Sequence, residues 1–140
     1  MKNIRKLIKE ELDKFKDNPR ISVKSLDDYK SIVSLIKKSN PIKISKIIEN
    51  WVIDHESELA DIICGVGERY INCEHAAEIV GEILSDAKIN HTLQVGTIDG
   101  QSHAWVRIND IIIDPTKDQF PNINNEDYDQ DILWEKSYEF

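Results

Sequence analysis

The chain has 140 residues, 40% of them apolar, and this length and composition suit one folded domain with its own core. A formal net charge of −8 argues against a general nucleic-acid binder, and no run is apolar enough to cross a membrane. Two cysteines are too few for a disulfide framework, and the N-terminus lacks a signal-type apolar stretch. We therefore expect a cytoplasmic protein with reduced thiols.

The charge is unevenly divided along the chain. Residues 1–50 hold 13 basic and 7 acidic side chains, whereas residues 51–140 hold 5 and 19. The basic half could form a surface for an anionic partner, or its lysines could be the solvated faces of helices. We favour solvated faces, because no aromatic residues interleave with these lysines. Neither nucleic acid nor a membrane is therefore expected as a partner, and the sequence indicates no oligomeric state.

Apolar residues recur at helical spacing through the first half of the chain. This pattern predicts three helices, over residues 4–15, 25–36 and about 44–58. Ser25 is the expected cap of the second helix. Residues 59–64 either continue the third helix or form a short one, and Gly65 and Gly67 end the pattern. We interpret residues 1–58 as a helical extension.

The second half of the chain changes from helical to strand patterns. Asn72 is a natural N-cap, so the apolar stripe of residues 73–87 predicts a helix whose first turn carries Cys73. Three strands follow, over residues 91–98, 103–108 and 111–113. A nucleophile helix packed on a small antiparallel sheet makes an α+β fold. We expect a single domain over residues 1–140, with a catalytic core at 59–120 and a C-terminal loop and tail at 121–140.

The turn at Asn109-Asp110 sets the register between the second and third predicted strands. If it is a two-residue loop, Trp105 lies opposite Asp114. Asp114 then becomes a diagonal neighbour of His103 on the same face, within reach of the imidazole. The register therefore predicts a His103–Asp114 pair.

The turn at Asp99-Gly100 sets the register on the other side of the same strand. It pairs Gly96 with His103 and Gln94 with Trp105. We expect Gly96 to leave space beside the imidazole and Gln94 to point toward the same face.

A thiol, an imidazole and a carboxylate that converge form a nucleophilic site. At a helix start, the helix dipole would favour the Cys73 thiolate. His103 would be its imidazolium partner and would later protonate the leaving group, while Asp114 would orient the ring. The backbone N–H of Cys73 is a candidate oxyanion donor. Candidates for a second donor or a substrate contact are Gln94, Trp51, Asn72 and Trp105.

The other reactive side chains indicate no further chemistry. We interpret Cys64 as structural and His75 as solvated, and neither forms zinc-ligand spacing with Cys73. The acidic stretch 127–138 begins like a calcium loop but lacks its glycine and its closing glutamate. Phosphate-binding and dinucleotide-binding glycine motifs are also missing from the sequence. We expect no metal and no cofactor.

Three motifs occur in order: Cys73-Glu74-His75-Ala76-Ala77, His103-Ala104-Trp105-Val106 and Asp114-Pro115-Thr116. Together they resemble the transglutaminase-like superfamily of papain-type cysteine enzymes, over roughly residues 70–117. The resemblance implies an α+β papain-like core and a Cys73–His103–Asp114 triad. The superfamily includes proteases, amidases, deamidases, peptide cross-linkers and members that have lost the triad. Asn72 departs from its pattern, in which a small residue or glycine is frequent just before the cysteine.

We therefore predict a cysteine-dependent hydrolase of the protease, amidase or deamidase type. It would attack an amide or related acyl bond of a peptide or protein substrate through an acyl-thioester on Cys73. One alternative is a catalytically inactive transglutaminase-like binding module that uses the helical half for a protein partner. A second is an amine acyltransferase with the same triad.

Overall fold

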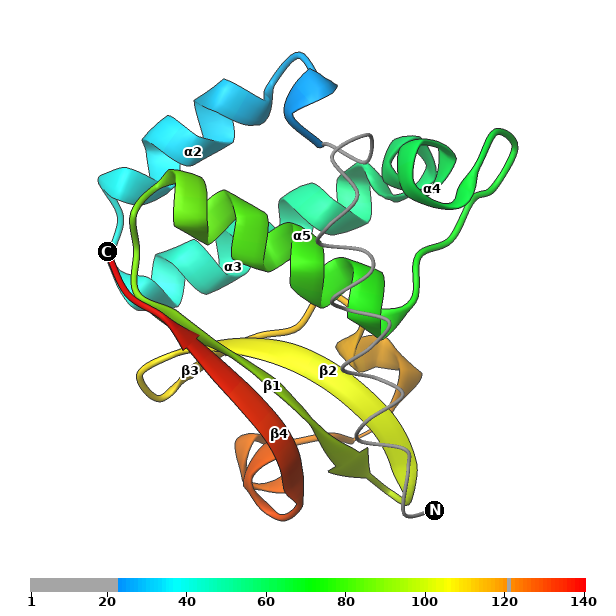
Figure 1. Ribbon diagram of the computed structural model, residues 1–140, viewed down its shortest axis with the longest axis vertical. Helices are drawn as coiled ribbons and strands as arrows, with labels where there is room; N and C mark the ends of the chain where they lie inside the picture. Colours follow the sequence, from blue (N-terminus) through cyan, green and yellow to red (C-terminus); the bar gives the residue numbers. More distant parts are fainter. Residues whose placement is uncertain (1–22, 121) are drawn as a thin grey trace.

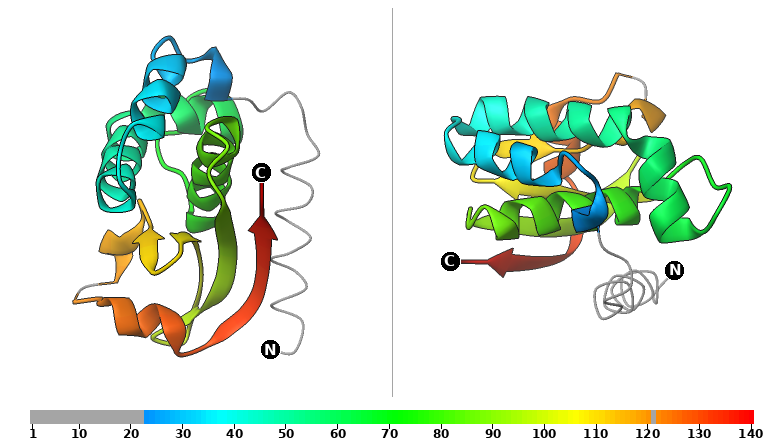
Figure 2. Two further views of the ribbon diagram at one scale, coloured as in Figure 1. Left: turned by 90° about the vertical axis from the view of Figure 1, so that its left-hand side faces the viewer. Right: turned by 90° about the horizontal axis from the view of Figure 1, so that it is seen from above.

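The computed structural model describes residues 23–120 and 122–140, and the helix predicted over residues 4–15 lies outside them. Within the described residues, four α-helices lie on one side of a four-stranded antiparallel sheet (Figure 1). The fold is therefore α+β, as predicted. Seen from the side, the helices and the sheet form separate layers (Figure 2). None of the described helices is long and apolar enough to cross a membrane.

The helical half differs from its prediction at the helix ends. It contains a short 3-10 helix, η1, at Val23–Ser25, then α2 at Tyr29–Lys37, α3 at Pro41–Asp54 and α4 at Glu56–Cys64. Ser25 lies in η1 and does not cap α2. Asn40 caps α3, because its side chain accepts the Lys43 N–H at 3.0 Å and Pro41 takes the first helical position. The chain bends at His55, so the predicted third helix is two helices.

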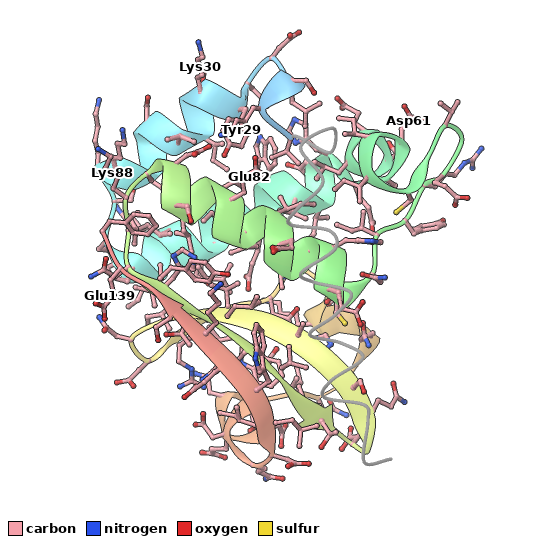
Figure 3. All side chains as sticks on the ribbon, viewed as in Figure 1. Tyr29, Lys30, Asp61, Glu82, Lys88 and Glu139 are labelled. Carbon is pink, nitrogen blue, oxygen red and sulfur yellow. The ribbon has the colours of Figure 1, made fainter. Side chains whose placement is uncertain are left out.

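Helix α5, at Cys73–Asp86, begins where the sequence predicts. Asn72 Oδ1 accepts the backbone N–H of His75 at 2.8 Å, and this cap leaves Cys73 as the first helical residue. The apolar stripe of α5 is buried in the main core. At the other end of α5, the Tyr29 hydroxyl of α2 donates to Asp86 Oδ2 at 2.5 Å. Figure 3 shows Tyr29 on the side of α2 that faces α5.

The sheet has the strand order β3-β2-β1-β4. Its strands are β1 at His91–Ile98, β2 at Gln101–Ile108, β3 at Ile111–Ile113 and β4 at Ile132–Tyr138. Asp99 and Gly100 both have positive φ, 51° and 76°, as a tight two-residue hairpin requires. The observed pairs confirm the predicted register: Gly96 with His103, Gln94 with Trp105, and Ile108 with Ile111.

The C-terminal segment is not the loop and tail that the sequence predicted. Residues 132–138 form β4, which pairs antiparallel with β1 from His91–Tyr138 to Gly96–Ile132. Before it, a short 3-10 helix, η3 at Asn125–Asp129, is closed by a capping box from Asn124. The segment therefore forms an edge strand of the sheet, beside β1 and on the opposite side from β2.

Gly96 is needed for a different reason from the one predicted. The β1–β4 register shifts beside it, and a Cβ at this position would lie 2.2 Å from the Asp131 carbonyl oxygen and 3.0 Å from Trp105 Cη2. The space at Gly96 is therefore filled by the backbone entering β4, and it is not left for the imidazole.

The sheet separates two apolar clusters. Ala104 and Val106 join the main core on the helix side. Because side chains alternate along a strand, His103 and Trp105 face the opposite side. There Trp105 packs in a second cluster with Ile98, Phe120 and Tyr128. Strand β3 ends opposite Val106, so the part of β2 that carries His103 extends beyond it.

Candidate active site

Cys73 stands at the start of α5 and is partly exposed. The backbone N–H groups of a first helical turn have no acceptor within the helix, and the helix dipole adds partial positive charge there. Both effects stabilise negative charge on a side chain or ligand at this place. The thiol is therefore located where the oxyanion of a substrate attached to it would be stabilised.

His103 of β2 forms a direct pair with Asp114, which follows β3. The His103 Nε2–H donates to Asp114 Oδ2 at 2.6 Å. Both residues are 1% exposed, so water screens their attraction weakly. The two residues that the predicted register made diagonal neighbours are thus in contact.

The second ring nitrogen of His103 takes no part in the bond to Asp114. Nδ1 is buried and has no hydrogen-bond partner of ordinary geometry among residues 23–120 and 122–140. Burial alone would lower the pKa of His103, but interactions with Asp114 and with the Cys73 thiol outweigh it and raise that pKa to about 9. The imidazole is therefore protonated at neutral pH. A protonated imidazole can deliver a proton to a leaving group.

Four donors hold the Asp114 carboxylate in place. Besides His103, Oδ2 accepts the Tyr128 hydroxyl at 2.8 Å. Oδ1 accepts the backbone N–H and the hydroxyl of Thr116, at 3.1 Å and 2.9 Å. Each carboxylate oxygen therefore has two donors, and the plane of the group is fixed.

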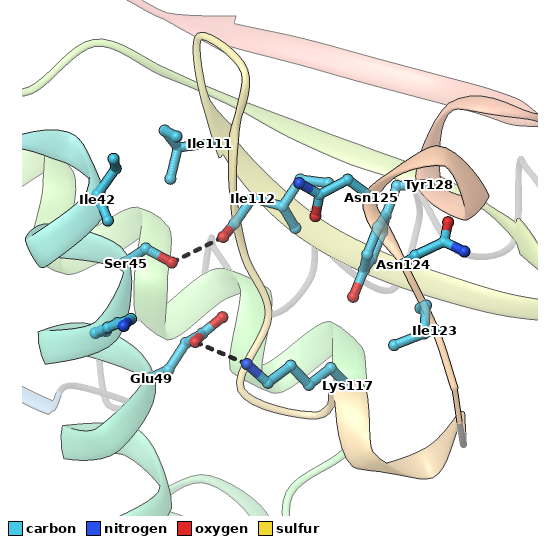
Figure 4. A pocket seen from close by; sticks show the side chains of 11 residues that line it. Ile42, Ser45, Glu49, Ile111, Ile112, Lys117, Ile123, Asn124, Asn125 and Tyr128 are labelled. Atoms are coloured by element: carbon cyan, nitrogen blue, oxygen red, sulfur yellow. Dashed lines mark hydrogen bonds and ion pairs between the residues drawn. The ribbon is translucent and has the colours of Figure 1, made fainter.

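Glu49 of α3 is a residue of this site that the sequence analysis missed. It is 8% exposed, and its Oε2 accepts the backbone N–H of Asp114 at 2.9 Å. Its Oε1 accepts Lys117 Nζ at 3.3 Å (Figure 4). Burial raises the pKa of Glu49, and the donors from Asp114 and Lys117 partly offset this effect. Glu49 lies four residues after Ser45, whose hydroxyl donates to the Ile112 carbonyl at 2.8 Å. Two polar residues on one buried helix face are the signal that could have revealed it.

Three aromatic rings surround the His103 imidazole. Trp105 stacks at 5.9 Å and 24°, Phe120 meets it edge-on at 4.8 Å and 84°, and Tyr128 lies tilted at 6.5 Å. Phe120 and Tyr128 belong to the segment between β3 and β4, which carried no predicted role. These rings exclude water and restrict the orientation of the imidazole.

The candidates for a second oxyanion donor or a substrate contact lie in different parts of the structure. Gln94 is engaged within the sheet: Oε1 accepts from Trp105 Nε1 at 2.8 Å and Arg107 Nε at 3.1 Å, and Nε2 donates to Glu135 at 2.9 Å. Trp105 therefore has its N–H occupied and contributes a ring face to His103. Asn72 adjoins Cys73, and its cap uses only its side-chain oxygen.

Trp51 packs in the helical layer. Its ring stacks on His55 at 4.6 Å and meets Tyr29 edge-on at 6.2 Å. Tyr29 bonds Asp86, the last residue of α5, at the opposite end from Cys73. The Trp51 Nε1–H is buried and has no acceptor in the part of the chain that the structure describes.

The second cysteine lies close to the first turn of α5. Cys64 is exposed at the end of α4, and its Sγ lies 3.6 Å from His75 Nδ1. Cys64 is therefore not a core residue, and His75 is partly buried against it. Burial, followed by the charge of Glu68, raises the pKa of the Cys64 thiol.

A cavity of about 280 Å³ lies between α3, β3 and η3 (Figure 4). Its lining includes Glu49, Lys117 and Tyr128, which contact Asp114 or its neighbours, but neither Cys73 nor His103. Across the described ranges, no group of three or more His, Cys, Asp or Glu side chains is arranged to hold a metal ion.

Comparison of the chain with models of known protein families, with curated proteins and with solved structures found no match. The chemistry of the site is therefore inferred from its own residues.

Proposed function

We propose that this chain is a cysteine-dependent hydrolase with a transglutaminase-like, papain-type core. It would act on an amide or related acyl bond of a peptide or protein. The observation that supports this most is the His103 imidazole: it is buried, bonded to Asp114 through Nε2, and interacts with the Cys73 thiol at the start of α5. A protonated imidazole in that position both stabilises a thiolate and can deliver a proton.

In the first step, the Cys73 thiolate would attack the carbonyl carbon and form a C–S bond. The backbone N–H of Cys73 is the candidate donor to the resulting oxyanion, with the Asn72 side-chain amide as its partner. The C–N bond then breaks, and the His103 imidazolium transfers its proton to the departing amine. The product is an acyl-thioester on Cys73 and a neutral imidazole.

In the second step, water would resolve the thioester. The neutral His103 takes a proton from the attacking water, the C–S bond breaks, and the acid product leaves. The thiolate and imidazolium are restored. Asp114 keeps the imidazole ring oriented throughout.

The test compares the two cysteines of one chain. Iodoacetamide at pH 6.5 should label Cys73 at least about tenfold faster than Cys64, because an ordinary thiol is only about 1% ionised there. His103→Gln should remove this advantage of Cys73 while leaving Cys64 labelling unchanged. Peptide mapping by mass spectrometry distinguishes the two sites.

Equal and slow labelling of both cysteines would reject the hydrolase and favour the inactive binding module with a protein partner on its helical half. The amine acyltransferase is separated by a second measurement. With p-nitrophenyl acetate as acyl donor, a hydrolase releases acetate at a rate independent of added amine, whereas an acyltransferase transfers the acetyl group to that amine.

A further inference from the structure

Asp114 Oδ2 has two donors, and only one of them belongs to the proposed triad. His103 Nε2–H donates at 2.6 Å, and the Tyr128 hydroxyl donates to the same oxygen at 2.8 Å. Tyr128 lies in η3, outside the region that resembles the transglutaminase-like superfamily. The oxygen that holds the imidazole is therefore shared between two donors.

The packing of Tyr128 leaves its hydroxyl little freedom. The residue is 3% exposed, and its ring meets Trp105 edge-on at 5.1 Å and 67°. Trp105 in turn stacks beside His103. Burial, followed by the charge of Asp114 and its hydrogen bond, raises the pKa of Tyr128, so the phenol stays a neutral donor wherever the imidazole titrates.

We infer that Tyr128 tunes the proposed triad through Asp114: its hydroxyl donates to the oxygen that holds His103 and withdraws negative charge from it. This inference rests on the proposed function for its catalytic meaning. The contact itself joins η3 to the residue after β3 and does not depend on that function.

Several charged groups lie near the His103–Asp114 pair and influence the protonation of His103. Cys73 of α5 acts electrostatically on the imidazole, and Glu49 of α3, paired with Lys117, lies against the Asp114 backbone. Asp127 adds charge near Tyr128. Tyr128→Phe changes none of these charged groups and removes only a neutral hydrogen-bond donor to Asp114. Its loss leaves more negative charge on Oδ2, so His103 should hold its proton more tightly.

A purely structural role for Tyr128 has the opposite consequence. If the hydroxyl only kept Asp114 from turning, its loss would weaken the His103–Asp114 bond. His103 would then lose its proton at a lower pH. The sign of the change therefore separates the two roles.

The experiment is an NMR titration of the ¹⁵N-labelled full chain, following the ring nitrogens of His103. In Tyr128→Phe the pKa of His103 should rise by about 0.5 to 1 unit, which is the size expected for the loss of one neutral hydrogen bond. Tyr29→Phe is the matched control, because it also removes a tyrosine hydroxyl bonded to a carboxylate, at the far end of α5. It should leave the titration of His103 unchanged.

A pKa of His103 that stays or falls in Tyr128→Phe overturns the inference, as does an equal rise in Tyr29→Phe. Catalysis gives a separate readout. Alkylation of Cys73 should stay fast in Tyr128→Phe, while acetate release from p-nitrophenyl acetate slows about three- to tenfold at pH 7. The reason is that a smaller fraction of a more basic imidazole is neutral at that pH and able to take a proton from the attacking water. If wild-type Cys73 is not rapidly alkylated, the proposed function fails, and the NMR titration still decides the role of Tyr128.

Discussion

The carboxylate of Glu49 accepts the backbone N–H of Asp114 at 2.9 Å, so one buried acid holds the main chain of another. Asp114 then uses its own carboxylate to hold His103. Glu49, from the helical half, thus supports the His103–Asp114 pair through the backbone of Asp114. Helix α3 therefore contributes a residue to the surroundings of the candidate site.

Replacing Glu49 tests how much this support contributes. Glu49→Ala should lower the free energy of unfolding by about 2–3 kcal/mol, because it leaves the buried N–H of Asp114 without its acceptor. Glu49→Gln keeps an acceptor for that N–H and removes a buried charge, so its cost should stay within about 1 kcal/mol. Urea denaturation measures both. If alanine is tolerated as well as glutamine, the hydrogen bond to Asp114 does not stabilise the fold.

The pH dependence of stability follows from the pKa of His103. Folding raises it from 6.5 to about 9, so the folded chain binds this proton more tightly than the unfolded chain. The stabilisation is complete below pH 6.5 and is lost as the pH rises to about 9. The free energy of unfolding should fall across this window by up to about 3 kcal/mol. His103→Gln should flatten the decline, and an equally steep decline in that variant would assign it to other groups.

Alanine substitutions at Gly96 and at Gly81 should change the free energy of unfolding in opposite directions. Gly96→Ala places a methyl group 2.2 Å from the Asp131 carbonyl oxygen, and displacing the backbone at β4 should cost about 1–3 kcal/mol. Gly81→Ala lies in α5 with its nearest contact at 3.6 Å, so better helix propensity should stabilise it by up to about 1 kcal/mol. Urea unfolding curves compare the two. If Gly96→Ala leaves the free energy of unfolding unchanged, β4 can shift without loss of stability.

Asn72 combines a capping role with a proposed catalytic one, and two substitutions separate them. Asn72→Ala removes the acceptor for His75 N–H and should cost about 1 kcal/mol of stability. Asn72→Asp keeps that acceptor and adds a charge that suits the helix dipole, so stability should be retained. It lacks the amide donor, however, and its charge opposes the Cys73 thiolate. Acetyl release should therefore slow while the urea midpoint holds. Unchanged release would remove Asn72 from the oxyanion candidates.

The parts of this site that the sequence predicted are those set by neighbouring residues. Asn72 marks the start of α5 because capping needs only the next turn of chain. The turn at Asp99-Gly100 fixes which residue lies opposite His103, because a two-residue loop permits one register.

The parts that it missed depend on contacts between distant segments. Glu49 reaches Asp114 across 65 positions of the chain, and nothing near Glu49 marks that partner. Phe120 and Tyr128 lie in a polar stretch whose aromatic residues have no periodic pattern. Gln94 was placed on the correct face, but its amide is engaged by Trp105 and Glu135, which lie on separate strands.

The long separation between Glu49 and Asp114 has a kinetic consequence. Contacts between residues far apart in sequence form late in folding, after the helices and the β1–β2 hairpin have had time to form. During refolding, protection of the α5 amides from hydrogen exchange should therefore precede the gain of Cys73 reactivity. The reactivity of the Cys73 thiol would then report when α3 and η3 complete their packing around the sheet.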